Sequence, residues 1–293
     1  MQIMPHLKPF SSLKPFSLSC VAMFLAISVC STNIAQAASF ERPADPLKSV
    51  MWSQMYDEFL GGGSRKVVFD KNVLVQTSQN VEDQFHVPVT VDARGIKDVK
   101  EIVVFSDLNP IWHVLTYKPQ DAEPYVSFRF KVQQSTPIRA AILTGDNVWH
   151  VGGVDLEAAG GGCTAPALAH GLPDWTVRLA EVRAKIWRSI DNREARLRVR
   201  IQHPMDTGLA DGIPAFFIEK LDIKSADGRM FGQLQVQEPV SENPTFTLMP
   251  RLRSADSSVI VDGRDIEGNN FRAVVPAPAR SSQLGSTAST GAR

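Results

Sequence analysis

The feature that most constrains the fold is a two-residue alternation of apolar and polar side chains in two distant parts of the chain. Residues 126–132 read VSFRFKV, and residues 196–201 read RLRVRI. A period of two puts successive side chains on opposite faces of a β-strand, so each segment predicts a strand with one buried and one wet face. Lys131 is expected on the wet face of the first of these strands.

Similar apolar runs, separated by turn-forming residues, predict further strands on both sides of the chain's centre. They cover residues 67–69, 87–91, 101–105, 138–143 and 148–154, and then 185–187, 216–223, 230–236, 245–248 and 259–261. Residues 47–60 instead have apolar side chains near helical spacing and end at three glycines, which predicts one helix. We therefore expect an all-β fold, with two antiparallel β-sandwich domains in tandem and a short N-terminal helix.

The first 37 residues have the pattern of a secretory signal peptide. Lys8 and Lys14 precede an apolar stretch over residues 16–29, and Ala35-Gln36-Ala37 forms a cleavage site. This predicts export to the periplasm of a Gram-negative cell, with cleavage near Ala37. A lipid anchor at Cys30 is the alternative. No later apolar run is long enough for a membrane span.

The charge balance argues against a nucleic-acid partner. The chain has 31 basic and 31 acidic side chains, and removal of Lys8 and Lys14 with the signal peptide leaves 29 and 31. Arg196, Arg198 and Arg200 form a basic stripe along one strand face. Such a stripe is usually a solvated face, and it can also attract an anionic cargo or an acidic partner.

Export leaves the chain with one cysteine, Cys163, since Cys20 and Cys30 lie in the signal peptide. Gly160, Gly161 and Gly162 precede Cys163 and Thr164 follows it. The surrounding residues 158–174 are rich in glycine and proline and have no periodicity, which is typical of a linker. We therefore expect a thiol displayed on a mobile arm that is tethered at both ends.

The uncharged neighbours of Cys163 favour a carrier cysteine over a catalytic one. No adjacent basic residue would lower its pKa from the value of free cysteine, so little thiolate would form at neutral pH. A slim, glycine-rich neighbourhood can instead enter the active site of another protein, which supplies the activation. An incidental linker thiol and a thiol that dimerises through an intermolecular disulfide are the alternatives.

The sequence gives little support for a metal site. Cys163, His170 and His150 could suggest mononuclear copper, but no methionine lies between Cys163 and Met205 and a glycine-rich arm is a poor rigid scaffold. Nucleotide-binding and hydrolase motifs are also absent from the sequence. We therefore expect no metal and no cofactor, apart from a covalent sulfur adduct on Cys163.

Several motifs resemble a known pair of protein families. The first half resembles SoxY, the sulfur-carrier subunit of the thiosulfate oxidation system. Its matching pieces are Val87-Pro88-Val89, Leu108-Asn109-Pro110, the segment Ser135-Thr136-Pro137-Ile138-Arg139-Ala140, and Gly161-Gly162-Cys163. The second half resembles SoxZ. Its matching pieces are His203-Pro204-Met205-Asp206-Thr207-Gly208 and Glu242-Asn243-Pro244.

The resemblance implies a fused SoxYZ-like carrier of the type associated with quinoprotein dehydrogenases. It implies immunoglobulin-like domains, SoxY-like over residues 38–157 and SoxZ-like over residues 175–275, joined by the arm and linker at residues 158–174. Residues 276–293 are expected to form a disordered tail. Cys163 would carry a sulfur species for separate periplasmic redox or sulfur-processing enzymes, and the protein itself would not be an enzyme.

The resemblance leaves two readings open. The segment His203–Gly208 would shape the interface or the surface facing the arm, or it would be a strand end with a proline stop. The protein as a whole could instead be a non-covalent binding or electron-transfer accessory of a quinoprotein dehydrogenase. The SoxY arm usually ends its chain, whereas Thr164 and a second domain follow Cys163 here.

Overall fold

The computed structural model describes residues 39–78, 80–189 and 194–278. The expected signal peptide, Cys30 and the tail from residue 279 onward lie outside them. The described residues belong to one compact unit. In the described part, no helix is long and apolar enough to cross a membrane.

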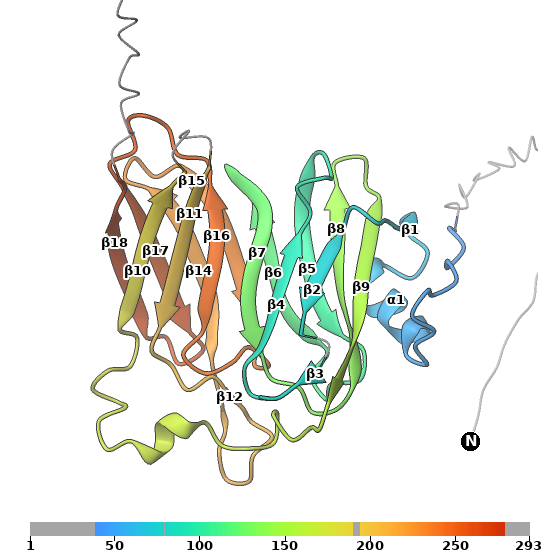
Figure 1. The fold of residues 1–293 in the computed structure, drawn as a ribbon, viewed down its shortest axis with the longest axis horizontal. Helices are drawn as coiled ribbons and strands as arrows, with labels where there is room; N and C mark the ends of the chain where they lie inside the picture. The colour runs from blue at the N-terminus through green and yellow to red at the C-terminus, as the bar shows by residue number, and fades with distance from the viewer. Residues whose placement is uncertain (1–38, 79, 190–193, 279–293) are drawn as a thin grey trace, which may run out of the picture. The chain divides into compact units, whose positions relative to one another are not determined.

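Nearly half of the described chain forms strands, and Figure 1 labels nearly all of them. The first half contains β1 (Val67–Phe69), β2 (Leu74–Thr77), β3 (Asn80–Val81), β4 (Val87–Asp92), β5 (Val99–Ser106), β6 (His113–Pro119), β7 (Ala122–Phe130), β8 (Thr136–Thr144) and β9 (Trp149–Ala158). The second half contains β10 (Val182–Arg188), β11 (Ala195–Ile201), β12 (Asp206–Thr207), β13 (Ala215–Phe216), β14 (Ile218–Ser225), β15 (Met230–Val236), β16 (Thr245–Pro250), β17 (Ser258–Asp265) and β18 (Asn270–Pro276).

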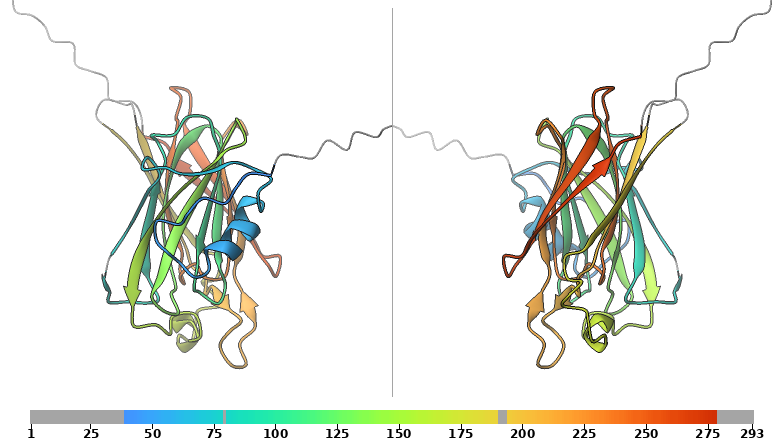
Figure 2. Two further views of the ribbon diagram at one scale, coloured as in Figure 1. Left: turned by 90° about the vertical axis from the view of Figure 1, so that its right-hand side faces the viewer. Right: turned by 90° about the vertical axis from the view of Figure 1, so that its left-hand side faces the viewer.

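The expected all-β fold, with two sheet-rich domains and a short helix, is confirmed. The two halves also share both of their sheets. One sheet runs β1-β9-β8-β5-β6-β15-β14-β17-β18, with β3 paired to β9, and the other runs β10-β11-β16-β7-β4-β2. Figures 1 and 2 show the sheets as two facing layers. The halves therefore meet edge to edge at the β6–β15 and β7–β16 pairs, which hold them in one sandwich.

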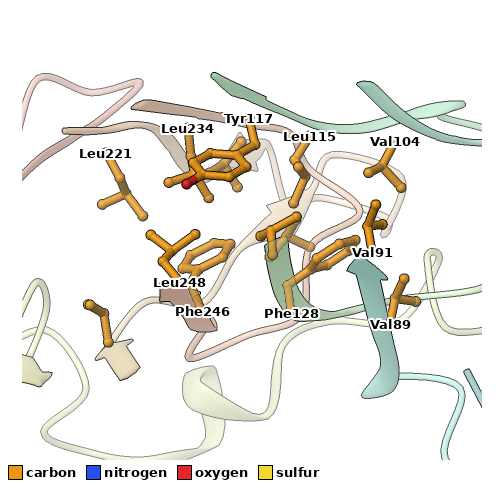
Figure 3. Close-up of a cluster of buried hydrophobic side chains, with 14 of the residues drawn as sticks. Val89, Val91, Val104, Leu115, Tyr117, Phe128, Leu221, Leu234, Phe246 and Leu248 are labelled. Atoms are coloured by element: carbon orange, nitrogen blue, oxygen red, sulfur yellow. The ribbon is translucent and has the colours of Figure 1, made fainter. Parts of the chain in front are cut away.

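The core between the layers is continuous across the two halves. Tyr117 and Phe128 come from the first half, and Leu234 and Phe246 come from the second, as Figure 3 shows. All four side chains are buried. Burial of a large apolar side chain typically stabilises a fold by about 1.5–3 kcal/mol, so this shared core opposes separation of the halves.

The helix α1 (Trp52–Leu60) covers the outer face of the ten-stranded sheet, where Trp52 and Leu60 pack against a second apolar cluster. It ends at Gly61, whose φ of 83° is the left-handed conformation that glycine adopts readily. The helix starts five residues later than expected from the apolar spacing. The Asp45 carboxylate accepts hydrogen bonds from the backbone ahead of it, and Lys48 has a φ of 54°, so those residues form turns instead.

An arginine fork fixes the segment before α1 to the sheet. The buried Arg139 guanidinium on β8 forms paired hydrogen bonds with Asp107, at 2.9–3.1 Å, and with Asp45, at 2.8–2.9 Å. Burial by itself raises the pKa of Asp45, but hydrogen bonds from Arg139 and the Ser49 backbone outweigh it and the pKa is lowered. Both carboxylates are therefore structural partners of one buried cation.

Several strands lacked a usable sequence signal. The sequence does not predict β6, because most of its side chains are buried on both faces and no alternation remains. β2, β3, β12 and β13 are only two to four residues long. The sequence does not predict β18 either, because this strand lies at an edge of the sheet and carries polar residues.

Candidate functional site

Cys163 lies at one end of the sandwich, on the segment that leaves β9 and crosses to β10. Figure 1 shows this segment passing along the ends of the strands near β12. The Cys163 side chain is completely buried. The expectation of an exposed thiol on a mobile arm is therefore wrong for this conformation, in which the arm is docked.

The arm docks because its glycines allow the backbone to approach the chain that follows β7. The Gly161 and Gly162 N–H groups donate to the carbonyls of Gln133 and Val132, at 3.1 and 2.9 Å. A Cβ atom at Gly162 would lie 2.3 Å from the Gln84 carbonyl oxygen, and one at Gly160 would lie 2.3 Å from that of Gln133. The glycines thus serve close packing, a property that composition does not distinguish from mobility.

Three hydrogen bonds hold Cys163 itself. Its N–H donates to Gln133 Oε1 at 3.2 Å, its Sγ donates to the Lys131 carbonyl at 3.5 Å, and its own carbonyl accepts from Thr207 Oγ1 at 2.6 Å. Thr164, which is exposed, donates to the same Gln133 oxygen at 3.4 Å. Cys163 is therefore fixed from both halves of the molecule.

Asn109 supports the surface on which the arm rests. Its Nδ2 donates to the Lys131 carbonyl at 3.0 Å, and its Oδ1 accepts the Gln133 N–H at 2.9 Å. Asn109 is itself buried. The Leu108-Asn109-Pro110 turn thus positions Lys131 and Gln133, two of the residues that contact Cys163 directly.

Lys131 is buried, which corrects its expected place on a wet strand face. β7 ends at Phe130, so the alternation no longer applies at the next residue. The Lys131 ammonium turns inward and donates to the Met205 carbonyl in the second half of the chain. Burial lowers the pKa of Lys131, and nearby Asp206 and Cys163 oppose that effect.

Burial also governs the Cys163 thiol. It raises the pKa of Cys163 from 9.0 to about 11, and the neighbouring Lys131 ammonium offsets this only in part. The expectation of a pKa near the free value is therefore wrong, because the sequence neighbours do not reveal the tertiary environment. At neutral pH the docked thiol is protonated and unreactive.

The segment His203–Gly208 forms the other wall of the arm site. Asp206 and Thr207 make up β12, paired with β13, and Gly208 has a φ of 76° at the turn that follows. Met205 is buried and its carbonyl accepts from Lys131, as described above, while Pro204 ends the strand region after β11. The segment lies against the arm and also serves as a packed strand end.

His203 is buried beneath that wall. Its Nδ1 accepts the Met205 N–H at 3.0 Å, so the ring proton lies on Nε2. Nε2 is 3.6 Å from Asp265 Oδ2 and has no hydrogen-bond partner among the described residues. Burial lowers the pKa of His203 to about 4, although Asp265 opposes the effect, so the ring is neutral at neutral pH.

The second part of the arm is anchored by two contacts to the SoxZ-like half of the sequence. His170, on a 3₁₀ helix (Leu168–Gly171), bonds through Nε2 to Asp206 Oδ2 at 2.8 Å. The Leu168 N–H donates to Glu242 Oε2 at 2.6 Å. Both anchors involve residues of the motifs that suggested SoxZ, so those motifs converge on the arm.

Cys163, His170 and His150 do not form a copper site in the structure. His170 pairs with Asp206, while His150 on β9 pairs through Nδ1 with Asp70 at 2.9 Å. Among the residues that the structure describes, no group of three or more His, Cys, Asp or Glu side chains is arranged to hold a metal ion.

Lys131, Gln133 and Asn109 are site residues that the sequence alone did not single out. A lysine and a glutamine at the end of a strand carry no distinctive pattern, and Asn109 was noted only as part of a turn. Their role depends on tertiary contacts with Cys163 and Met205.

Fold and site together define a two-layer β protein in which Cys163, the one cysteine among the described residues, lies on the arm between the halves. The SoxY family (sulfur oxidation protein SoxY) matches residues 57–163, and the SoxZ family (sulphur oxidation protein SoxZ) matches residues 188–276. The chain therefore contains a SoxY domain followed in tandem by a SoxZ domain. The SoxY match ends at Cys163 itself.

Among solved structures, the chain is similar to the sulfur carrier protein SoxY from Chlorobium limicola f thiosulfatophilum. The two are 18% identical with a TM-score of 0.31, over 36% of this chain and 87% of that chain. No curated protein matches the chain.

Proposed function

We propose that this protein is a periplasmic covalent carrier that holds a sulfur-linked intermediate on Cys163 and presents it to partner enzymes. The observation that carries the proposal is the position of Cys163. It is the last residue of the SoxY match, and it sits on a segment held by hydrogen bonds that can open. The carrier itself performs no catalysis and needs no cofactor.

The docked arm suits the unloaded carrier. The buried thiol is kept protonated, which shields it from oxidation in an oxidising compartment. Packed backbone also surrounds the arm, and a methyl group at Gly162 alone would collide with it. A sulfur adduct adds atoms at Sγ, so the loaded arm leaves this site and becomes available to an enzyme.

Loading is an oxidation when the cargo is an anionic sulfur species and the product contains a new S–S bond. The Cys163 thiol loses its proton, its sulfur bonds to the cargo sulfur, and two electrons leave the pair. A partner redox enzyme accepts these electrons. Unloading by hydrolysis or thiol exchange then restores the free thiol.

The partners proposed on this basis are periplasmic redox or sulfur-processing enzymes, with a quinoprotein dehydrogenase as one candidate. Intact-mass analysis of the protein purified from its host tests the carrier role. We expect a mass increase that disappears on reduction and is absent from Cys163→Ser. Unmodified thiol under every growth condition would contradict it.

A second function, a non-covalent accessory of a quinoprotein dehydrogenase, is favoured by the same burial of Cys163. A protein that works without its thiol would keep it packed in this way. In that case Cys163→Ser leaves complex formation and dehydrogenase activity unchanged. Loss of activity in Cys163→Ser would exclude the accessory role.

A further inference from the structure

The outer face of the smaller sheet carries a strong local excess of positive charge. We call the part formed by β10, β11, β16 and the end of β7 the basic face. Seven basic side chains and two carboxylates line its hollows, although the whole chain has a formal net charge of zero. The basic residues are Arg129, Arg183, Lys185, Arg188, Arg196, Arg198 and Arg200.

The strand register places like charges directly opposite each other. Arg183 on β10 faces Arg200 on β11, and Lys185 faces Arg198. Directly opposed like charges destabilise a sheet, so neither pair contributes to folding. Neighbouring positions on β16 are Thr245 and Thr247, which are short and uncharged. The arrangement is therefore unfavourable in the free protein and would be relieved by a bound anion.

Few carboxylates among the described residues neutralise the four opposed cations Arg183, Lys185, Arg198 and Arg200. Arg183 pairs with Glu181, at 3.0 Å, and remains 69% exposed. Within the described parts of the chain, Lys185, Arg198 and Arg200 have no ion pair. The charge on this face is thus largely available to a binding partner.

The shape of the basic face suits an extended partner. It has two open hollows of about 580 and 460 Å³, which share Trp187 and Arg198 in their walls. Trp187 is 41% exposed, and the Lys185 ammonium lies 5.3 Å from its ring centre. Strands β11 and β16 are paired on both sides within the sheet, so they offer only side chains to a partner. Exposed aromatic and arginine side chains are typical anchors of protein interfaces.

We propose that the basic face docks an acidic surface of a partner protein. Four adjacent strands about 4.8 Å apart span roughly 15 Å, which gives a small, strongly charged patch. Small charged interfaces form quickly and release quickly, as required of a protein that visits one partner after another. Which partner docks depends on the proposed carrier function, whereas the acidic character of its surface does not.

Glu242 links the basic face to the arm. Glu242 lines the hollow of about 460 Å³, together with Arg129 and Arg200. Its Oε2 accepts the Leu168 N–H of the arm segment. A partner docked on the basic face therefore lies next to one anchor of the Cys163 arm. Docking there brings the partner to the segment that must move for the thiol to emerge.

Binding to fluorescent poly-L-glutamate, measured by anisotropy with the full protein at low salt, tests the charge recognition. The double variant Lys185→Glu/Arg198→Glu should bind at least about tenfold more weakly. Lys185→Arg/Arg198→Lys keeps the charges and should bind normally. Lys71→Glu/Lys97→Glu changes the net charge equally at exposed sites outside the face and should also bind normally.

The same variants distinguish the kind of partner and the dependence on the carrier role. Vesicles containing phosphatidylglycerol and a single-stranded oligonucleotide serve as competing polyanions. Tighter binding of either one, lost in Lys185→Glu/Arg198→Glu, would overturn the proposal in favour of a membrane or nucleic-acid surface. Absence of polyglutamate binding, or equal loss in the Lys71 and Lys97 control, would also overturn it. Binding retained in Cys163→Ser supports docking even if no adduct is ever found on Cys163.

Discussion

The Thr207 hydroxyl of the SoxZ domain donates a 2.6 Å hydrogen bond to the backbone carbonyl of Cys163 at the end of the SoxY match. It thus joins the domain that supplies the thiol to the domain that covers it. Fusion of the two domains in one chain keeps these partners together. The second domain therefore acts as the cover of the docked arm.

Replacement of Thr207 by valine should release the arm more often. The change removes the bond to the Cys163 carbonyl and also the one that Thr207 Oγ1 accepts from the Leu209 N–H at 3.2 Å. Loss of the donor to the buried Cys163 carbonyl costs the docked state about 1–3 kcal/mol. We expect Thr207→Val to react with a thiol reagent about 5- to 150-fold faster than the wild type at pH 8. Thr116→Val, at a buried threonine on β6, is the matched control. Equal rates in all three proteins would mean that this bond does not hold the arm.

Two of the arm glycines should differ in their effect when each is changed to alanine. Gly162→Ala collides with two backbone carbonyls, at 2.3 and 2.7 Å, so it should expose the thiol more strongly than Gly161→Ala. Gly161→Ala meets open space but has a φ of 92°, which costs roughly 1–2 kcal/mol in the docked conformation.

Gly171→Ala provides the control for these variants, because it has open space and no left-handed φ. Thiol labelling followed by mass spectrometry should therefore rank Gly162→Ala above Gly161→Ala, with Gly171→Ala equal to the wild type. A ranking in which Gly171→Ala matches Gly162→Ala would show that the glycines act through flexibility and not through close packing.

Much of this fold could be predicted because each half-buried strand shows its environment in the alternation of its own side chains. The strand at residues 196–201 and the halt of the helix at Gly61 are of this kind. β6 could not be found in the same way, since adjacent side chains along it are buried and no alternation is left. Shared sheets could not be predicted either, because the β6–β15 pairing joins segments more than a hundred residues apart.

The cysteine was predictable as the central residue, but its surroundings were not. Counting cysteines singles out Cys163, and the glycines beside it indicate an unusual backbone. Whether glycine permits motion or close packing depends on what lies opposite, which here is the segment after β7. The alternation of buried and exposed side chains holds as far as Phe130, the last residue of β7. It does not apply to Lys131, the next residue, because the strand has ended there.

Alkylation of Cys163 should keep accelerating with pH well beyond the ordinary range of a thiol. In the docked arm the pKa of the Cys163 thiol is about 11, against 9.0 for a free thiol, because burial favours the neutral form. The neutral thiol therefore stabilises the docked arm fully below pH 9, and this stabilisation is lost as the pH rises toward 11. Over that range the equilibrium constant for docking falls by a factor of about 100.

The logarithm of the wild-type alkylation rate should therefore rise without a plateau from pH 7 to pH 10. In Gly162→Ala, whose arm is released, the rate should level off near pH 9. Stopped-flow measurements with iodoacetamide give both profiles. A wild-type plateau near pH 9 would mean that the thiol is solvated in solution.

The buried neutral His203 should make the protein sensitive to acid. Burial holds the folded-state pKa near 4, whereas an unfolded histidine titrates near 6.5. The unfolded chain therefore takes up this proton first, so the contribution is intact above pH 6.5 and is lost as the pH falls toward 4. The loss amounts to about 3 kcal/mol of the free energy of unfolding. His203→Asn keeps an acceptor for the Met205 N–H without a titrating ring. Urea unfolding between pH 7 and pH 4 should show a shallower decline for His203→Asn than for the wild type, and parallel curves would contradict the burial of a neutral ring.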